Sequence, residues 1–440
     1  MTETSNSGIV STRQQRIAQV ARQAPQMAFT SLNHSIDLAW LKEAYRRTRK
    51  DGAVGVDGRT AQEYEVDLEA NLQSLLNRAK SGTYKAPPVR RVHIPKGTGK
   101  DTRPIGIPTF EDKVLQRAVA MVLEPIYEQD FYDGSYGFRP GRSAHQALQS
   151  LWDQTMRTGG GWLLEVDIRK FFDTLDHAVL RELVQRRVRD GVLLRLIGKW
   201  LHAGVFEGGQ ITYPEAGSPQ GGVISPMLAN IYLHYVLDEW FVQDVRPRMS
   251  GQVFLIRYAD DLVIGLTHPE DARRVMDVLP KRFGKYGLTI HPEKTRLVPF
   301  QKPSRTSREK DSKNDGPGTF DLLGFTHSWG RSCKGHWVVK RKTAKGRFTR
   351  ALKAIYQWCK VNRHQPLTEQ QRTLSQKMRG HYAYYGVTGN FYALTAFQSR
   401  VQRIWRKWLG RRKRDGQLRW DAFNRLLKRY PLPAAVVVHS

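Results

Sequence analysis

Hydrophobic side chains recur at helical spacing along most of the chain. Between residues 37 and 50, Leu38, Leu41, Ala44 and Tyr45 would share one face of a helix. Polar or glycine-containing stretches separate such segments and mark turns. On this pattern further helices are predicted at residues 60–80, 110–125, 141–157, 177–203, 221–243, 269–286, 345–362, 367–385 and 391–412.

Extended segments are fewer and shorter. Residues 81–108 combine β-branched runs with five prolines, which predicts a β-hairpin with residues 96–100 at its tip. Residues 1–30 are polar and are expected to form a loose start, and residues 301–318 an exposed loop. Other short strands are predicted at residues 162–168, 209–213, 254–258 and 262–266.

The length and the charge distribution of the chain indicate how these elements are organised into domains. The chain has 440 residues, which predicts two or three domains. Its 71 basic and 41 acidic residues leave a formal charge of +30, which favours a polyanionic partner such as nucleic acid. Residues 331–440 hold 26 basic and 3 acidic residues, whereas residues 1–330 hold 45 and 38. This split indicates an enzymatic body followed by a basic binding region.

The cysteines and the hydrophobic runs exclude several classes of protein. Cys333 and Cys359 form no paired pattern, so neither a disulfide framework nor a cysteine zinc site is expected, and a reducing cytosol fits. No signal peptide is recognised, and no run of about 18 apolar residues is present to predict a membrane span. A cytoplasmic protein without a membrane partner is expected.

Acidic residues at strand ends carry the candidate chemistry. Asp260 and Asp261 stand between two apolar strands, where a hairpin would place both at its tip. Adjacent like charges are unfavourable unless a cation lies between them, although an Asp pair in a solvated turn is also common. Asp167 ends another apolar strand 93 residues earlier, and alone it could be a helix N-cap. If the fold joins the three carboxylates, they could hold two Mg²⁺ ions.

Other segments surround these acids in a recognisable order. Seven or more such segments in one order are highly specific, whereas any one of them alone is not. The segments are Gly55-Val56-Asp57-Gly58, Arg103-Pro104-Ile105-Gly106-Ile107-Pro108, Tyr136-Gly137-Phe138-Arg139-Pro140-Gly141-Arg142-Ser143, Asp167 with Phe171-Phe172, Gly217-Ser218-Pro219-Gln220-Gly221-Gly222 with Ser225, Pro226 and Asn230, Tyr258-Ala259-Asp260-Asp261, Gly287-Leu288 with His291-Pro292-Glu293-Lys294-Thr295, and residues 320–325.

In this order the segments resemble the reverse transcriptases encoded by bacterial group II introns, over about residues 35–440. With only two cysteines, the chain resembles the compact type that lacks the zinc-bearing C-terminal endonuclease. The resemblance implies an α+β right-hand polymerase with an added basic helical maturase domain. The implied domains are an N-terminal extension at residues 1–80, fingers and palm at 81–330, the start of a helical thumb at 331–375, and the thumb end with the RNA- and DNA-binding maturase domain at 376–440.

The resemblance also implies what the protein does. It would be an RNA-directed DNA polymerase that copies intron RNA with dNTPs, and a maturase that stabilises group II intron RNA in a ribonucleoprotein. A primer strand and a DNA target would be further partners, so a bacterial, nucleoid-associated location is expected. Two other functions stay open: a domesticated reverse transcriptase in repair or phage defence, and an RNA-binding maturase without polymerase activity.

Individual residues receive roles from the same resemblance. Asp167, Asp260, Asp261 and the backbone carbonyl of Ile168 would bind the two Mg²⁺ ions. Phe172 would exclude the ribose 2′-hydroxyl, with Phe171 expected in the core; alternatively, Phe172 is itself a core aromatic. The remaining nucleotide-binding residues would be Gln220, Arg103, Lys96 and Lys100, the two lysines being alternatively a solvated tip.

The basic residues near the end have two interpretations. Lys294 could support the palm site or the primer, or it could form a structural helix cap or salt bridge. Four adjacent cations repel one another without an anion, so nucleic-acid binding is favoured for Arg411, Arg412, Lys413 and Arg414. Three nearby tryptophans could stack on RNA, but packing in a small helical core is the favoured expectation for Trp405, Trp408 and Trp420.

Overall fold

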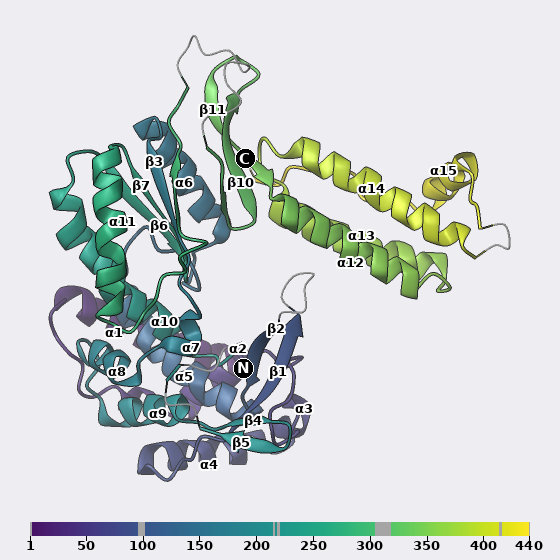
Figure 1. The fold of residues 1–440 in the computed structure, drawn as a ribbon. Coiled ribbons are helices and arrows are strands. Elements are labelled where there is room, and N and C mark those ends of the chain that lie inside the picture. Colours follow the sequence, from purple (N-terminus) through teal and green to yellow (C-terminus); the bar gives the residue numbers. More distant parts are fainter. Residues whose placement is uncertain are drawn as a thin grey trace. The chain divides into compact units, whose positions relative to one another are not determined.

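The computed structural model describes residues 2–95, 102–213, 216–217, 221–303, 318–412 and 416–439 (Figure 1). It divides into two compact units. The first unit comprises Met1–Ser150 and Leu164–Leu297, and the second Leu151–Leu163 and Val298–Ser440. Helices and mainly antiparallel sheets together confirm the predicted α+β class. None of the described helices is long and apolar enough to cross a membrane.

The first unit begins with helices, where a loose start was predicted for residues 1–30. That prediction is wrong, because α1 (Thr2–Gln23) is a helix that packs on α2 (Leu38–Arg47) and α5 (Phe110–Tyr127). Its buried side chains are Val10, Ile17 and Ala21, which share one face through their spacing of seven and four residues. The narrow apolar stripe is hidden within an otherwise polar sequence. Two further helices follow α2: α3 (Ala61–Glu65) and α4 (Leu68–Ser81).

The predicted hairpin at residues 81–108 is confirmed. Strands β1 (Val89–Pro95) and β2 (Thr102–Ile107) pair antiparallel, and Pro95 lies opposite Thr102. Lys96 and Lys100 fall outside the described residues. Strands β4 (Val205–Glu207) and β5 (Gln210–Thr212) extend this sheet in the order β2-β1-β4-β5.

The single helix predicted at residues 177–203 is two helices, α8 (His177–Gln185) and α9 (Gly191–Leu201). Asp190 separates them because its side chain accepts the backbone N–H groups of Val192 and Leu193 and caps α9. The same carboxylate accepts the N–H groups of Leu32 and Asn33. One aspartate therefore both breaks the helical run and anchors a distant segment.

A second sheet, with strand order β6-β7-β3-β8, carries the acidic residues. Its strands are β6 (Val253–Tyr258), β7 (Asp261–Leu266), β3 (Trp162–Val166) and β8 (Arg296–Pro299). Helix α10 (Ser225–Leu233) continues into π-helical turns at His234–Asp238 and Phe241–Val245, which extend two residues beyond the helical stretch predicted at 221–243. The remaining elements here are α6 (Ala144–Thr158), α7 (Phe171–Thr174) and α11 (Pro269–Gly284).

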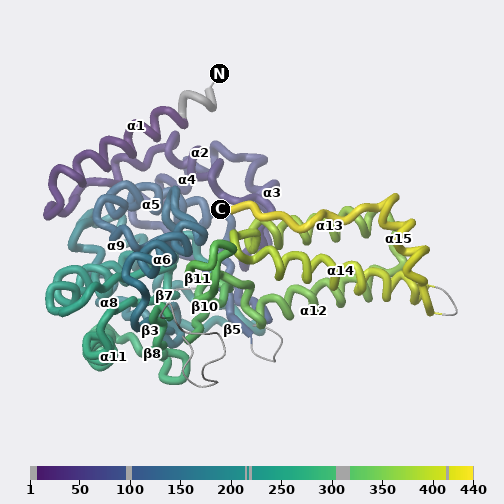
Figure 2. Tube along the Cα trace, turned by 90° about the horizontal axis from the view of Figure 1, so that it is seen from above, coloured from purple at the N-terminus to yellow at the C-terminus, as the bar shows by residue number. Residues whose placement is uncertain are grey.

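The second unit joins a small sheet to a group of helices. Strands β9 (Phe320–Leu322), β10 (Phe325–Arg331) and β11 (Trp337–Thr343) form a sheet in the order β11-β10-β9. Seen from above in Figure 2, α12, α13 and α14 run side by side, with α15 near one end. These helices span Lys345–Val361, Leu367–Tyr385, Phe391–Gly410 and Trp420–Arg429.

The tryptophans of the second unit follow the packing expectation in two of three cases. Trp405 is fully buried and Trp408 is buried, both in a core with Leu374, Phe397 and Phe423. Trp420, by contrast, is 43% exposed and lies under the guanidinium of Arg406, 4.1 Å from its ring centroid. The helical core of this unit therefore combines aromatic and aliphatic side chains.

Candidate active site

The turn between β6 and β7 presents the adjacent acids. Tyr258 pairs with Asp261 across the hairpin, so Ala259 and Asp260 form a two-residue turn. Ala259 has a φ of 56°, in the left-handed region where a hairpin turn favours glycine. For an alanine this conformation costs about 1–2 kcal/mol. The turn is thus locally strained, and surrounding contacts must hold it.

Asp167 lies directly after β3, on the neighbouring strand of the same sheet. Its backbone carbonyl accepts the N–H of His291 at 2.8 Å, and its own N–H donates to the hydroxyl of Thr295 at 3.3 Å. Its carboxylate is half-exposed and lies 3.2 Å from the ammonium of Lys294. Of the alternatives for Lys294, the structure shows a salt bridge, and its partner is the candidate metal ligand itself.

Electrostatics connect Asp260 with Asp167 and Arg103. Burial raises the pKa of Asp260, and the negative charge of Asp167 raises it further, while Arg103 and Arg257 oppose the shift. Asp261 begins β7 and is exposed. Within the described part of the chain, no three His, Cys, Asp or Glu side chains lie close enough together to hold a metal ion.

The structure therefore brings Asp167 and Asp260 within electrostatic range without forming a closed ligand cluster. The donor set still fits a divalent cation, because carboxylate oxygens are the ligands that Mg²⁺ prefers. Repulsion between Asp167 and Asp260 is also what a bound cation would relieve.

The residues after Asp167 separate into a core position and an accessible one. Ile168 is buried and forms an isolated antiparallel bridge with Ile290. Phe171 is buried against Tyr232, as expected for the core member of the pair. Phe172 is partly exposed and meets Phe171 edge-on at 5.3 Å between ring centroids.

Two glycines bring another predicted segment against these residues. Gly217 has a φ of 94°, and a Cβ there would lie 2.9 Å from the carbonyl oxygens of both Phe172 and Asp173. A Cβ at Gly221, whose φ is 115°, would lie 2.6 Å from the carbonyl oxygen of Gly106 in β2. The segment's ends therefore contact the Phe172 backbone and the strand of Arg103, whereas Gln220 lies outside the described residues.

His177 also holds this segment, although nothing in the sequence pattern singled it out. Its Nε2 donates to the carbonyl of Gly217 at 2.6 Å, while the N–H of Gly217 donates to the carbonyl of Leu175 at 2.8 Å. The side chain is buried, and its ring meets that of His202 edge-on at 4.9 Å. Only the tertiary fold places His177 beside a glycine 40 residues later.

The predicted basic run is only partly described. Arg411 is exposed, just beyond the last residue of α14. The guanidinium of Arg412 donates to the backbone carbonyls of Arg363 and Gln365, between α12 and α13. Lys413 and Arg414 lie outside the described residues. Adjacent arginines in this run thus have different surroundings.

Comparison with known proteins defines the class to which this fold and site belong. Residues 94–327, more than half of the chain, match the family model described as reverse transcriptase (RNA-dependent DNA polymerase). The chain therefore belongs to the reverse transcriptase family, and its mixed helices and sheets are consistent with the right-hand polymerase fold. Divalent metal ions are generally used in this family.

Individual relatives refine this assignment. Protein YkfC of Escherichia coli is 40% identical over 288 residues, which cover 58% of this chain and 75% of that protein. Group II intron-encoded protein LtrA of Lactococcus lactis is 45% identical over 177 residues, covering 40% of this chain but only 29% of LtrA. A mitochondrial nuclear intron maturase 1 of Arabidopsis thaliana is 33% identical over 90 residues, 20% of this chain and 12% of that protein.

Proposed function

We propose that this protein copies group II intron RNA into DNA and also binds that RNA as a maturase. The single observation that carries the proposal is the strained turn at Asp260, whose carboxylate lies within electrostatic range of Asp167, within a reverse transcriptase domain. The surplus of 23 positive charges in residues 331–440 supports an RNA partner for the second unit. Similarity to LtrA and to an intron maturase supports intron RNA in particular.

In this proposal Asp167, Asp260, Asp261 and the backbone carbonyl of Ile168 hold two Mg²⁺ ions. Bound Mg²⁺ would supply activation of the primer 3′-hydroxyl and neutralisation of the leaving pyrophosphate. Lys294 compensates the charge of Asp167, and its half-exposed ammonium is available to a primer phosphate.

The nucleotide would be recognised by residues around the same sheet. Arg103 is exposed on β2 and interacts electrostatically with Asp260, so its guanidinium would pair with the dNTP triphosphate. Lys96, Lys100 and Gln220 are proposed as further contacts. The partly exposed ring of Phe172 would exclude a ribose 2′-hydroxyl, which favours dNTPs over rNTPs.

Nucleic acid would also contact the exposed basic residues of the second unit. Arg411 is proposed as a phosphate contact, together with Lys413 and Arg414 and with any exposed face of Arg412. The location proposed with these partners is the bacterial cytoplasm at the nucleoid, where the protein would meet a DNA target and a primer strand. The expected complex is therefore a ribonucleoprotein that meets DNA.

Primer extension on an RNA template with dNTPs and Mg²⁺ tests the polymerase directly. Asp260→Ala should abolish extension while RNA binding is retained, because only a metal ligand is lost. Asp277→Ala is the matched control, since Asp277 is an exposed acid on α11. Folded wild-type protein that extends no primer on several templates would contradict the proposed polymerase activity.

The maturase part has its own test, which uses a group II intron RNA and measures splicing. Since the proposed RNA contacts lie mainly in the second unit, Asp260→Ala should splice as well as wild type. Loss of both splicing and extension in a correctly folded Asp260→Ala variant would contradict the separation of the two activities. Splicing without any extension by the wild type would leave RNA binding as the function.

A further inference from the structure

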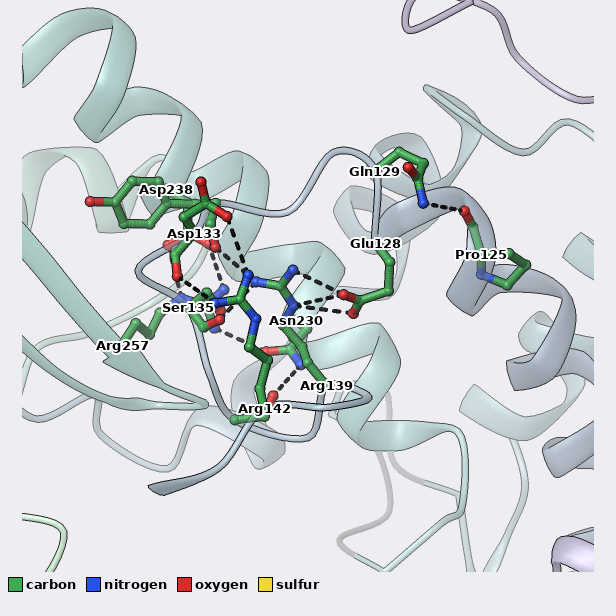
Figure 3. A network of polar contacts seen from close by, with 12 residues as sticks. Pro125, Glu128, Gln129, Asp133, Ser135, Arg139, Arg142, Asn230, Asp238 and Arg257 are labelled. Atoms are coloured by element: carbon green, nitrogen blue, oxygen red, sulfur yellow. Dashed lines mark hydrogen bonds and ion pairs between the residues drawn. The ribbon is translucent and has the colours of Figure 1, made fainter. Parts of the chain in front are cut away.

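One buried arginine lies two residues before the acidic turn. The side chain of Arg257 is fully buried, and its Nε and one terminal nitrogen donate to the two carboxylate oxygens of Asp238 at 2.8 and 2.5 Å (Figure 3). Asp238 ends the first π-helical turn after α10, and its side chain is also fully buried. A buried charge is strongly unfavourable unless it is paired and hydrogen-bonded, so this ion pair fixes the guanidinium in one orientation.

The remaining terminal nitrogen of Arg257 points to the turn. It donates to the carbonyl of Ala259 at 3.2 Å and to the side-chain oxygen of Asn230 at 3.0 Å. The amide nitrogen of Asn230 in turn donates to the carbonyl of Gly137 at 2.7 Å. The guanidinium therefore bonds the strained residue of the turn, while Asp238 and Asn230 hold the guanidinium.

The backbone on the other side of the turn closes this arrangement. A Cβ at Gly137 would lie 2.3 Å from the backbone nitrogen of Ala259, so only glycine permits this approach. The N–H of Arg257 donates to the carbonyl of Gly134, and the N–H of Tyr136 to the carbonyl of Arg257, both at 2.8 Å. Ala259 thus lies between a fixed guanidinium and a fixed backbone.

The segment that contains Gly137 is itself anchored. Arg139 is buried and donates to the carboxylate of Glu128 as well as to the carbonyls of Tyr132 and Ser135 (Figure 3). The bond to Glu128 joins the segment to the end of α5, and the bonds to the two carbonyls restrict movement within the segment. A second arginine thereby supports the position of Gly137 as the first supports that of Ala259.

We propose that Arg257 is a positioning residue, which holds the Ala259 carbonyl and so sets the direction of the Asp260 and Asp261 carboxylates. Asn230 and Gly137 complete this cradle. Released from the cradle, Ala259 would leave its left-handed conformation, and the two carboxylates would turn with the backbone. The inference rests on the proposed function only in that the two carboxylates are taken to bind the metal ions used in DNA synthesis.

Replacing the buried ion pair by apolar residues separates positioning from stability. Arg257→Met alone would leave Asp238 buried without its partner, so loss of folding there would be uninformative. The double variant Arg257→Met/Asp238→Leu removes both charges, a change that buried ion pairs often tolerate. It should keep the wild-type circular dichroism and RNA affinity, but lose about 100-fold in kcat because the carboxylates are misplaced.

Gly137→Ala tests the same cradle from the other side and leaves the ion pair intact. The added methyl group must displace the turn, so kcat should fall by at least about tenfold with the dNTP KM nearly unchanged. Gly284→Ala is the matched control, because a Cβ at this exposed helical glycine meets nothing within 4 Å. Wild-type kcat in both Gly137→Ala and the folded double variant would overturn the proposal.

Two readouts distinguish failure of this inference from failure of the proposed function. Mn²⁺ binding, followed by electron paramagnetic resonance, should weaken in both variants without any need for polymerisation. Amide hydrogen exchange should accelerate in peptides that span the β6–β7 turn, but not in α9 or α11. Wild-type exchange and Mn²⁺ affinity in both variants would reject the cradle, even if the wild type proved to extend no primer.

Discussion

Two short runs of like charge, one in each unit, are held by opposite means. Asp260 and Asp261 lie at a turn that is fixed by buried polar groups, chiefly Arg257 and its partners. Arg411 and Arg412 follow α14, whose last turns are fixed by buried aromatic and aliphatic side chains. In the first case a hydrogen bond reaches the backbone of the turn itself. In the second, packing fixes the helix and leaves an exposed side chain at its end.

The difference teaches what each run can do. Two metal ions would need carboxylates placed within a fraction of an ångström, and directional hydrogen bonds supply such placement. Phosphate binding by exposed arginines needs charge more than fixed geometry, because the sequence-independent part of nucleic-acid binding comes from counterion release. In the proposed function, the two runs of adjacent like charges would therefore belong to two different kinds of site.

The largest expected effect concerns the packing behind the basic run. Trp405 is fully buried, donates its indole N–H to the side chain of Gln370 at 2.9 Å, and meets Phe423 edge-on. Trp405→Ala should lower the free energy of unfolding by about 3–5 kcal/mol. Trp420→Ala is the matched control, since this half-exposed ring should contribute only about 0.5–1 kcal/mol through Arg406. Denaturant unfolding followed by circular dichroism measures both, and equal losses would contradict an aromatic core centred on Trp405.

Much of this architecture was predictable because it repeats locally. Helical spacing identified α12, α13 and α14, and the hairpin of β1 and β2 followed from β-branched runs between turns. Strands β10 and β11 were not predicted, since the inward positions of the pair include His327 and Arg341, which lie opposite each other and are buried. Polar residues at buried positions remove the alternation on which a strand prediction depends.

The candidate site shows the same limit. Adjacent acids at Asp260 and Asp261 were visible in the sequence, and the family resemblance joined Asp167 to them. The supporting contacts of Arg257, Asn230 and His177 were not predicted as such, because each depends on a partner brought close by the fold, 19 to 93 residues away. Local pattern thus finds the residues that would do chemistry more readily than those that hold them.

Low pH should destabilise the second unit through the buried pair of His327 and Arg341. His327 is fully buried, stacked on Phe320 with ring centroids 4.7 Å apart, and faces Arg341, near which Asp153 lies. Burial and, to a smaller extent, the positive charge of Arg341 together lower the pKa of His327 to about 3. In the unfolded chain the same imidazole has a pKa near 6.5. The stability contributed by keeping His327 neutral is therefore fully present above that pH, and it is lost as the pH falls towards 3.

Between pH 7.5 and 5 the loss of stability that comes from His327 should be about 2 kcal/mol. His327→Phe keeps an aromatic ring against Phe320 but removes the titrating group. The variant should therefore lose less stability than the wild type when thermal unfolding is compared at pH 7.5 and pH 5. Burial also lowers the pKa of His234 to about 3 and of His381 to about 4, so part of the acid sensitivity should remain in the variant. An unchanged pH dependence would show that His327 is not the titrating group.

The smallest expected effects come from single substitutions in the basic run, and they should differ between Arg411 and Arg412. Arg411 is exposed, so Arg411→Ala should weaken RNA binding and reduce the slope of log affinity against log salt by about 1, as for one lost phosphate contact. Arg412 donates to the carbonyls of Arg363 and Gln365, so Arg412→Ala should instead lower the free energy of unfolding by about 1 kcal/mol. Filter binding at several salt concentrations, beside denaturant unfolding, separates the two effects.

If both variants changed the salt slope equally and left stability unchanged, the carbonyl contacts of Arg412 would contribute nothing in solution, and the whole run would act as one exposed phosphate-binding surface. If only Arg411→Ala changed the slope, neighbouring arginines would have divided into a ligand contact and a structural one, which is the distinction that charge alone cannot make.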